Sequence, residues 1–177
     1  MGWFSPIKGS YPSLAQVDKT LPVKKGVDTV TRGTIVALKE DPSSREGVWN
    51  VASGTDELLY VALADFSDPA SGFAGSAFNP DGGVPRITAI SLSMDGEYET
   101  TEFDATKTYK AGEPLYAEGG KLTNVKGTAT TVAGYVTMPA ATRWINDAIA
   151  VPADCKDPRL AIRTGANKPV LRFRTAK

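Results

Sequence analysis

The residues of this sequence best suited to chemistry are four acidic side chains between positions 97 and 104. Glu97, Glu99, Glu102 and Asp104 recur at short intervals in a segment of β-type residues. Carboxylates in such an arrangement suit a calcium site or an acid/base pair. The alternative is the solvent-facing side of a strand, which is the commoner place for alternating acidic residues. The sequence favours this second interpretation.

The remaining composition excludes most other kinds of active site. The chain has 177 residues, no histidine and a single cysteine, Cys155. There is consequently no Ser-His-Asp or Cys-His site, ordinary zinc site, iron–sulfur cluster or internal disulfide. The phosphate-binding, dinucleotide-binding and nucleophile-elbow motifs are also missing. We therefore expect no enzymatic activity, no cofactor and no metal, and Cys155 is expected to be an inert thiol.

Short β-type segments between turn residues dominate from residue 27 onward. The predicted strands cover residues 33–38, 48–51, 58–63, 86–94, 97–103, 112–117, 121–125 and 131–136. Asp95-Gly96 lies between two of these segments and predicts a type I′ hairpin, because both central residues of that turn need positive φ. Gly119-Gly120 predicts a second turn. The fold class indicated is all-β.

Residues 139–149 are the one segment for which a helix is expected. Pro139 suits the first turn of a helix, and Ile145 and Ile149 then fall on one face. A strand that includes Trp144 and Ile145 is the competing interpretation.

Residues 1–26 have the character of an extended arm. Their prolines break any helix, yet the segment carries aromatic side chains that a disordered tail usually lacks. We expect these side chains to anchor the arm on a surface, either its own or a partner's. The candidate anchors are Trp3, Phe4, Ile7 and Tyr11.

Two further segments carry candidate partner contacts. The stretch 64–85 is long and holds Phe66, Phe73 and Phe78. It is either a loop packed on its own domain or a contact between subunits. The end of the chain alternates apolar and basic residues, as an edge strand or a strand added to a partner's sheet would. The candidate contacts there are Arg172, Phe173 and Arg174.

Charge is distributed unevenly, although the formal net charge is zero. Residues 1–26 have a net charge of +3 and residues 156–177 of +6, whereas the residues between them have a net charge of −9. The basic ends either bind an acidic surface of another subunit or fold back on the body of their own chain. An acidic body disfavours direct binding of nucleic acid, and no stretch is apolar enough for a membrane span.

Two parts of the sequence show a weak internal similarity. The run Gly33-Thr-Ile-Val-Ala followed by Tyr60-Val-Ala is similar to Gly112-Glu-Pro-Leu-Tyr-Ala followed by Gly134-Tyr-Val. In each, a glycine opens a strand, a short strand containing Asn follows, and an apolar strand returns. The pattern predicts two similar halves of a small barrel or clip. Chance is the alternative, because glycine-bounded strands are common in all-β domains.

The second of these halves also carries a pattern known from a family of proteins. It combines Gly112-Glu-Pro-Leu-Tyr-Ala, the Gly119-Gly120 turn, Lys121-Leu-Thr and Gly134-Tyr-Val. Over about residues 105–137, and more loosely over 27–63, it resembles the head decoration proteins of tailed double-stranded DNA bacteriophages. The resemblance implies a small β-tulip or β-clip domain with an N-terminal arm. It also implies trimers that bind the major capsid protein on the outer surface of the shell.

The expectation is therefore a virion structural protein, a capsid decoration or cement protein that assembles in the host cytoplasm. Its expected parts are an arm at 1–26, a β-rich barrel-like core at 27–137 and a C-terminal extension at 138–177, with at most one short helix. One alternative is a tail or neck component of the particle. The other is a carbohydrate-binding module that uses aromatic stacking platforms. The candidate platforms are Trp49, Tyr98 and Tyr116.

Overall fold

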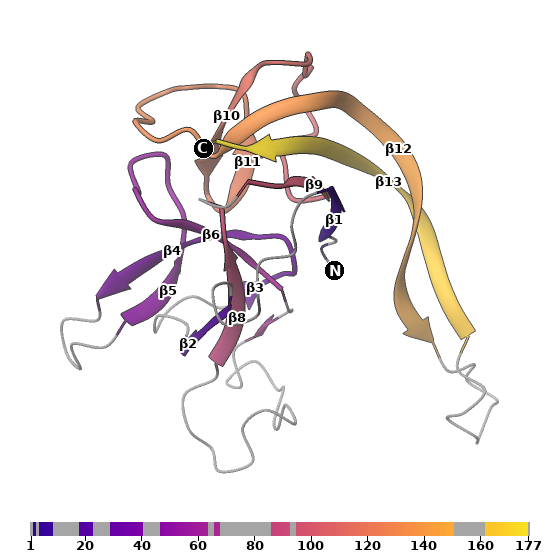
Figure 1. Cartoon of the computed structure of the whole chain (residues 1–177). Coiled ribbons are helices and arrows are strands. Elements are labelled where there is room, and N and C mark those ends of the chain that lie inside the picture. The colour runs from indigo at the N-terminus through magenta and orange to yellow at the C-terminus, as the bar shows by residue number, and fades with distance from the viewer. Residues whose placement is uncertain are drawn as a thin grey trace, which may run out of the picture.

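The computed structural model shows an all-β chain (Figure 1). It describes residues 2, 4–8, 18–22, 29–40, 47–63, 66–67, 86–92, 95–150 and 162–176, and within these it contains strands and no helix. The strands are β1 (Phe4–Lys8), β2 (Asp18–Pro22), β3 (Thr29–Val30), β4 (Ile35–Glu40), β5 (Gly47–Val51), β6 (Leu59–Ala62), β7 (Phe66–Ser67), β8 (Arg86–Ser91), β9 (Glu97–Thr100), β10 (Pro114–Glu118), β11 (Lys121–Thr123), β12 (Gly134–Ala150) and β13 (Ile162–Thr175).

The strands form two main sheets and a small third one. The six-stranded sheet has the order β1-β9-β13-β12-β10-β11, and the five-stranded sheet has the order β2-β8-β6-β4-β5. Strands β3 and β7 pair as a separate two-stranded sheet. All of these pairings are antiparallel. The edge strands β2 and β5 of the five-stranded sheet also contact each other, so this sheet curls towards a barrel.

The central strands of the five-stranded sheet are buried on both faces over Ile35–Ala37 of β4 and Leu59–Ala62 of β6. Successive side chains of a strand point to opposite faces, and along β4 Ile35 packs in one hydrophobic core while Val36 packs in the other. Strand β6 does the same with Val61 and Tyr60. A strand that is covered on both faces needs apolar residues throughout, which accounts for the unbroken apolar sequence Leu59–Ala62 of β6.

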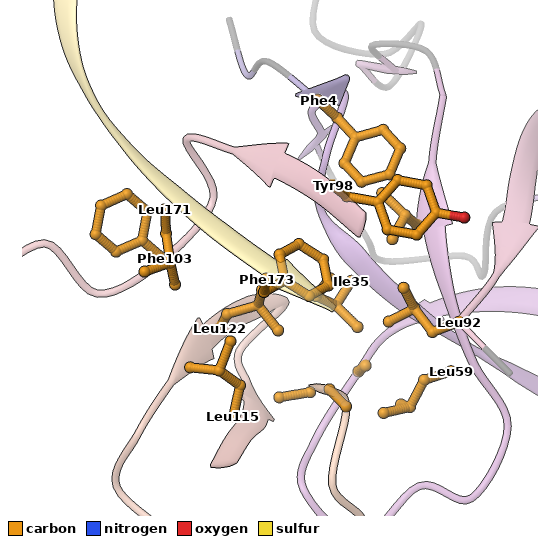
Figure 2. Close-up of a cluster of buried hydrophobic side chains, with 14 of the residues drawn as sticks. Phe4, Ile35, Leu59, Leu92, Tyr98, Phe103, Leu115, Leu122, Leu171 and Phe173 are labelled. Carbon is orange, nitrogen blue, oxygen red and sulfur yellow. The ribbon is translucent and has the colours of Figure 1, made fainter. Parts of the chain in front are cut away.

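The larger core lies between the two main sheets and draws on strands from the whole length of the chain (Figure 2). Phe4 of β1 stacks on Tyr98 of β9 with ring centroids 5.0 Å apart. Tyr98 in turn contacts Phe173 of β13 at 6.0 Å. Aromatic pairs of this kind stabilise a fold beyond the area that they bury. The first, middle and last parts of the chain are thus joined in one core.

The smaller core lies on the other face of the five-stranded sheet. Trp49 and Tyr60 pack there with ring centroids 4.8 Å apart. The indole nitrogen of Trp49 donates a hydrogen bond to the carbonyl oxygen of Ile87 at 2.9 Å. The indole of Trp49 is therefore completely buried while its N–H group keeps a hydrogen-bond partner.

The predicted Gly119-Gly120 turn is confirmed. Strands β10 and β11 pair directly across it, with Glu118 opposite Lys121. Both glycines have positive φ, 54° and 77°, which is the requirement of the type I′ turn that joins twisted strands most readily.

The hairpin predicted at Asp95-Gly96 is not formed. Strand β8, which precedes this dipeptide, belongs to the five-stranded sheet, and β9, which follows it, belongs to the six-stranded sheet. Gly96 is not among the described glycines with positive φ. Its carbonyl instead accepts a hydrogen bond from the amide of Thr175 at 3.1 Å, and its own amide donates to the Thr175 hydroxyl at 3.2 Å. The dipeptide therefore lies in the connection between a strand of the five-stranded sheet and a strand of the six-stranded sheet.

The helix expected at 139–149 is also absent, and the competing strand interpretation is the correct one. Strand β12 runs through this segment and pairs with β13 from Gly134 opposite Thr175 to Ala150 opposite Ile162. Pro139 lies between Met138 and Ala141, where the register shifts. Proline is tolerated at such irregularities because no ladder hydrogen bond is required there.

Two strands come from the segment that was expected to be an arm. Strand β1 pairs with β9 at the edge of the six-stranded sheet, and β2 pairs with β8 at the edge of the five-stranded sheet. The described parts of residues 1–26 are therefore built into the two sheets.

The internal similarity seen in the sequence is present in the topology. Strand β4 lies between β5 and β6, and β10 lies between β11 and β12. In both cases the first strand is central, the second pairs on one side of it, and the third returns on the other side. The similarity thus extends to the order of the strands.

Candidate interaction surface

Two of the residues expected at a partner surface are core residues. Phe4 is 2% exposed and Phe173 is fully buried. Both rings pack in the larger core of their own chain (Figure 2). The expectation that these two side chains contact a partner is therefore replaced by a structural role, because a ring that fills its own core presents no surface.

Arg172 is bound by a buried carboxylate of its own chain. Its Nε and Nη2 atoms donate to Oε1 of Glu99 at 2.9 and 2.6 Å. Nη2 of Arg143, on the neighbouring strand β12, lies 3.1 Å from the same oxygen. Glu99 is only 3% exposed, and a buried charge is strongly unfavourable unless it is paired. We call Glu99, Arg143 and Arg172 the Glu99 junction.

Arg174 also pairs with its own chain. Its Nε and Nη2 atoms each donate to a carboxylate oxygen of Asp95 at 2.9 Å. Hydrogen bonding to Asp95, helped by the negative charge of that residue, raises the pKa of Arg174. For Arg172 and Arg174 the basic end therefore folds back on the body of its own chain. The ion pair between Arg174 and Asp95 is exposed, so its contribution to stability is small.

The structure gives less information on the other expected contacts. Ile7 lies in β1 and Phe66 in β7, and only their backbone is described. Trp3, Tyr11, Phe73 and Phe78 lie outside the described residues, as does Cys155.

The acidic segment has structural partners. Glu97 accepts a hydrogen bond from the hydroxyl of Thr137 at 2.7 Å. Asp104 accepts from the hydroxyl and the amide of Thr106, which lowers its pKa. The expectation of a solvent-facing row fails at Glu99, which is buried in the Glu99 junction. Within the described part of the chain, no group of three or more acidic or cysteine side chains could hold a metal ion.

The most prominent surface is formed by β12 and β13. Strand β10 pairs with β12 only at Gly134 and Tyr135, and β9 pairs with β13 only between Leu171 and Arg174. Beyond these points the two strands continue as a pair, and Figure 1 shows them curving away from the rest of the molecule. We call residues 137–150 and 162–170 the ribbon.

The ribbon exposes side chains of the kinds found at protein interfaces. Trp144 is 62% exposed, Met138 45% and Arg143 44%, and Tyr135 at the base of the ribbon is 44% exposed. Tryptophan, tyrosine, methionine and arginine are enriched where proteins bind one another. By contrast, Ile145 and Val170 of the ribbon are buried. Sequence analysis did not single out this surface, although the strand alternative through Trp144 and Ile145 pointed to it.

A pocket of about 160 Å³ opens between the two main sheets. Leu58, Leu92 and Val132 contribute to its apolar lining, and Glu57 lies beside them. Pockets for small molecules usually measure about 300–1,000 Å³. This pocket is therefore smaller than a typical small-molecule site.

The three expected stacking platforms are not open to a carbohydrate. Trp49 is fully buried, Tyr98 is 5% exposed and Tyr116 is 8% exposed. A ring must present a free face to stack on a sugar, so these residues serve the core instead.

No protein-family model, no curated protein and no solved structure matches this chain. Among the residues that the structure describes, there is also no helix that could cross a lipid bilayer.

Proposed function

We propose that this chain is a structural protein of a virus particle, a decoration or cement protein that binds the outer surface of an assembled capsid. The observation that supports this function best is the ribbon, a projecting pair of strands with exposed Met138, Arg143 and Trp144 on an all-β body. Such an element suits contact with other polypeptides, because aromatic and arginine side chains carry most of the binding energy at interfaces.

The strand order adds support to this proposal. The segment that resembles phage head decoration proteins folds into β10, the Gly119-Gly120 turn, β11 and the start of β12. These are the strand, turn, short strand and return strand that the resemblance implies. The partners in this proposal are the major capsid protein and further copies of the chain itself, with a trimer favoured.

Such a protein acts by binding and needs no turnover. It stabilises the assembled shell because it binds this state and not the separated subunits. The gain at each joint is modest, but it is repeated at every equivalent joint of the particle.

The direct test is sedimentation of the purified full chain with capsids of its virus that lack it. The chain should move with the capsids and raise the temperature at which they release their genome. Retention of the chain in the supernatant, or its recovery with isolated tails instead of heads, would contradict the proposal.

Variants refine this test. Met138→Ala combined with Trp144→Ala should reduce binding to capsids, because it truncates the exposed apolar side chains of the ribbon. Leu58→Ala combined with Val125→Ala is the matched control, since these side chains are similarly exposed but lie on the body. Deletion of residues 2–20 is unsuitable, because it removes β1, most of β2 and the core residue Phe4.

A further inference from the structure

The dipeptide Asp95-Gly96 has the sequence for a spontaneous change of the backbone, the formation of isoaspartate. In this reaction the glycine amide nitrogen attacks the carboxyl carbon of the aspartate side chain, and water leaves as a five-membered succinimide ring closes. Water then opens the ring at either carbonyl and gives aspartate or isoaspartate, so the mass of the chain is unchanged. A glycine favours the attack because it has no side chain to obstruct the approach to its nitrogen.

The fold requires a glycine at this position. A Cβ atom on Gly96 would lie 2.5–2.7 Å from three atoms of the Tyr98 side chain. This ring cannot easily move aside, because Tyr98 is buried and packs against Phe4 and Phe173 in the larger core (Figure 2). A larger residue would slow the attack on the Asp95 carboxyl, but it does not fit here. The chain therefore keeps a reactive dipeptide next to its core.

The end of β13 holds both reacting groups of this dipeptide. Arg174 donates from Nε and Nη2 to the two carboxylate oxygens of Asp95, each at 2.9 Å, and such a bidentate pair fixes the orientation of the carboxylate. The amide of Gly96 donates to the hydroxyl of Thr175 at 3.2 Å, and Thr175 is only 3% exposed. The attack requires the carboxyl group to turn towards this amide, so both contacts must open first.

We propose that Arg174 and Thr175 protect Asp95 from isomerisation, and that Asp95-Gly96 is a modification site that becomes reactive when the end of β13 leaves it. Both residues come from one strand, so a single local opening releases the carboxylate and the amide together. The only co-reactant is water. The inference is independent of the proposed function.

The modification would also prevent the strand from returning to its place. Isoaspartate lengthens the backbone by one methylene carbon immediately before β9. The pairing of β9 with β13 ends at Glu97 opposite Arg174, and the next bond joins the Thr175 amide to the Gly96 carbonyl at 3.1 Å. A longer backbone at residue 95 cannot keep both this register and the bidentate pair. Isoaspartate at this position therefore marks chains in which the end of β13 has been displaced.

The test follows isoaspartate in the full chain, in native buffer and in urea, by mass spectrometry with electron-transfer fragmentation. Asp81-Gly82 repeats the dipeptide outside the described residues, and in urea it gives the reference rate. Asp95 should react like Asp81 in urea. In native buffer Asp95 should react at least about tenfold more slowly than in urea, since only opened molecules react. Equal rates at Asp95 in the two solutions would overturn the proposal.

Variants then test the two contacts. Arg174→Ala should raise the rate at Asp95 in native buffer about two- to fivefold, the factor that matches an exposed ion pair. Thr175→Val keeps the buried volume but removes the acceptor of the Gly96 amide, and it should raise the rate as well. Gly120→Ala is the control, because it crowds Thr34 and Val51 elsewhere in the molecule and should leave the rate at Asp95 unchanged.

The control separates protection by these contacts from general stability. If Arg174→Ala and Thr175→Val left the rate unchanged, the end of β13 would not protect the dipeptide. If Gly120→Ala raised the rate as much as they do, isomerisation would follow unfolding of the whole chain. Either result would overturn the proposal.

Discussion

The segments 31–62 and 110–136 share one backbone plan. In each segment, a glycine with positive φ lies just before the first strand. The amide of this glycine donates a hydrogen bond to a backbone carbonyl oxygen of the third strand. Gly33 donates to Ala62 at 2.8 Å, and Gly112 donates to Val136 at 2.7 Å. The hydrogen bonds in the other direction also match. The amide of Ala62 donates to the backbone carbonyl of Thr34 at 3.0 Å, and the amide of Val136 donates to the backbone carbonyl of Glu113 at 2.9 Å. Chance similarity of sequence would not produce these paired hydrogen bonds.

The turn before each strand is closed by a different side chain. The hydroxyl of Thr34 accepts a hydrogen bond from the amide of Thr31 at 3.1 Å. At the equivalent place a carboxylate oxygen of Glu113 accepts from the amide of Lys110 at 2.9 Å. The backbone plan is therefore kept while the side-chain chemistry changes, since both groups supply the one acceptor that the turn requires.

The two segments differ most where the return strand ends. In the first, β6 ends at Ala62, and the chain goes on to the separate strand β7. In the second, β12 continues from Val136 to Ala150 and forms the ribbon with β13. The same three-strand arrangement can therefore lie wholly within the body of the molecule or form the base of a projecting pair of strands. The length of the third strand decides between these two outcomes.

The largest expected change in stability distinguishes a substitution at the base of the ribbon from one on the ribbon itself. Phe173→Ala removes a fully buried ring from β13 and should lower the free energy of unfolding by about 3–5 kcal/mol. Trp144→Ala, on the exposed part of the ribbon, should change it by less than about 0.5 kcal/mol. Urea unfolding followed by circular dichroism measures both. Equal effects of the two changes would show that the ribbon is part of the body's core.

The next effect concerns the contact between the two segments. A Cβ atom on Gly120 would lie 2.7 Å from Thr34 Cγ2 and 2.8 Å from Val51 Cγ1, and its φ is positive. Gly120→Ala should therefore cost about 2–4 kcal/mol, from crowding added to backbone strain. Gly119 also has positive φ but faces open space, so Gly119→Ala should cost only about 1 kcal/mol. If thermal unfolding shows the same loss for both variants, the two segments do not pack together in this way.

A smaller effect tests the Glu99 junction. Glu99→Gln leaves Arg143 and Arg172 without their shared anion and should cost about 1–2 kcal/mol, because both arginines are partly exposed and water compensates in part. The same change should raise hydrogen exchange in β12 beyond residue 137. Asp95→Asn weakens the exposed pair with Arg174 and should change both quantities less than Glu99→Gln does. Unchanged exchange in β12 after Glu99→Gln would show that the junction does not hold the ribbon.

The smallest effect is a pH dependence in the first segment. Burial acts to raise the pKa of Asp56, but hydrogen bonds from Lys39 and Ser53 outweigh it, and the pKa is lowered. The folded chain therefore holds a proton on Asp56 less tightly than the unfolded chain does. The resulting stabilisation is complete above the unfolded-state pKa of roughly 3.9 and is lost as the pH falls through the folded-state value.

Asp56→Asn should remove this contribution. Its stability at neutral pH should fall, and the loss of stability between pH 5 and acid should be shallower than in the unaltered chain. The exposed neighbour variant Glu57→Gln is the control, and urea midpoints across the pH range are the measurement. If the urea midpoints of Asp56→Asn fell with pH in parallel with those of the unaltered chain, this carboxylate would have no part in acid unfolding.

Local patterns predicted the parts of the fold that depend on local chemistry. The all-β class, most strand positions and the Gly119-Gly120 turn follow from alternation and from the need for positive φ. The Asp95-Gly96 hairpin was wrong because Thr175, far away in the sequence, takes both backbone groups of Gly96. The helix at 139–149 was wrong because β13 supplies a strand partner that the local sequence does not reveal.

The interaction surface was harder to predict. An apolar residue outside a clear pattern can fill its own core or contact a partner, and sequence does not distinguish these cases. Phe4 and Phe173 illustrate this, since both are buried in their own chain. The ribbon could have been found by joining two observations, the strand alternative at Trp144 and the alternation at 170–174.

The position of β9 has a consequence for synthesis of the chain. This strand, from the middle of the sequence, pairs on one side with β1 and on the other with β13. During synthesis β1 and β9 leave the ribosome well before β13, because β13 lies more than sixty residues further along the chain. The six-stranded sheet is therefore completed only after β13 has emerged, and until then Tyr98 of β9 lacks its contact with Phe173.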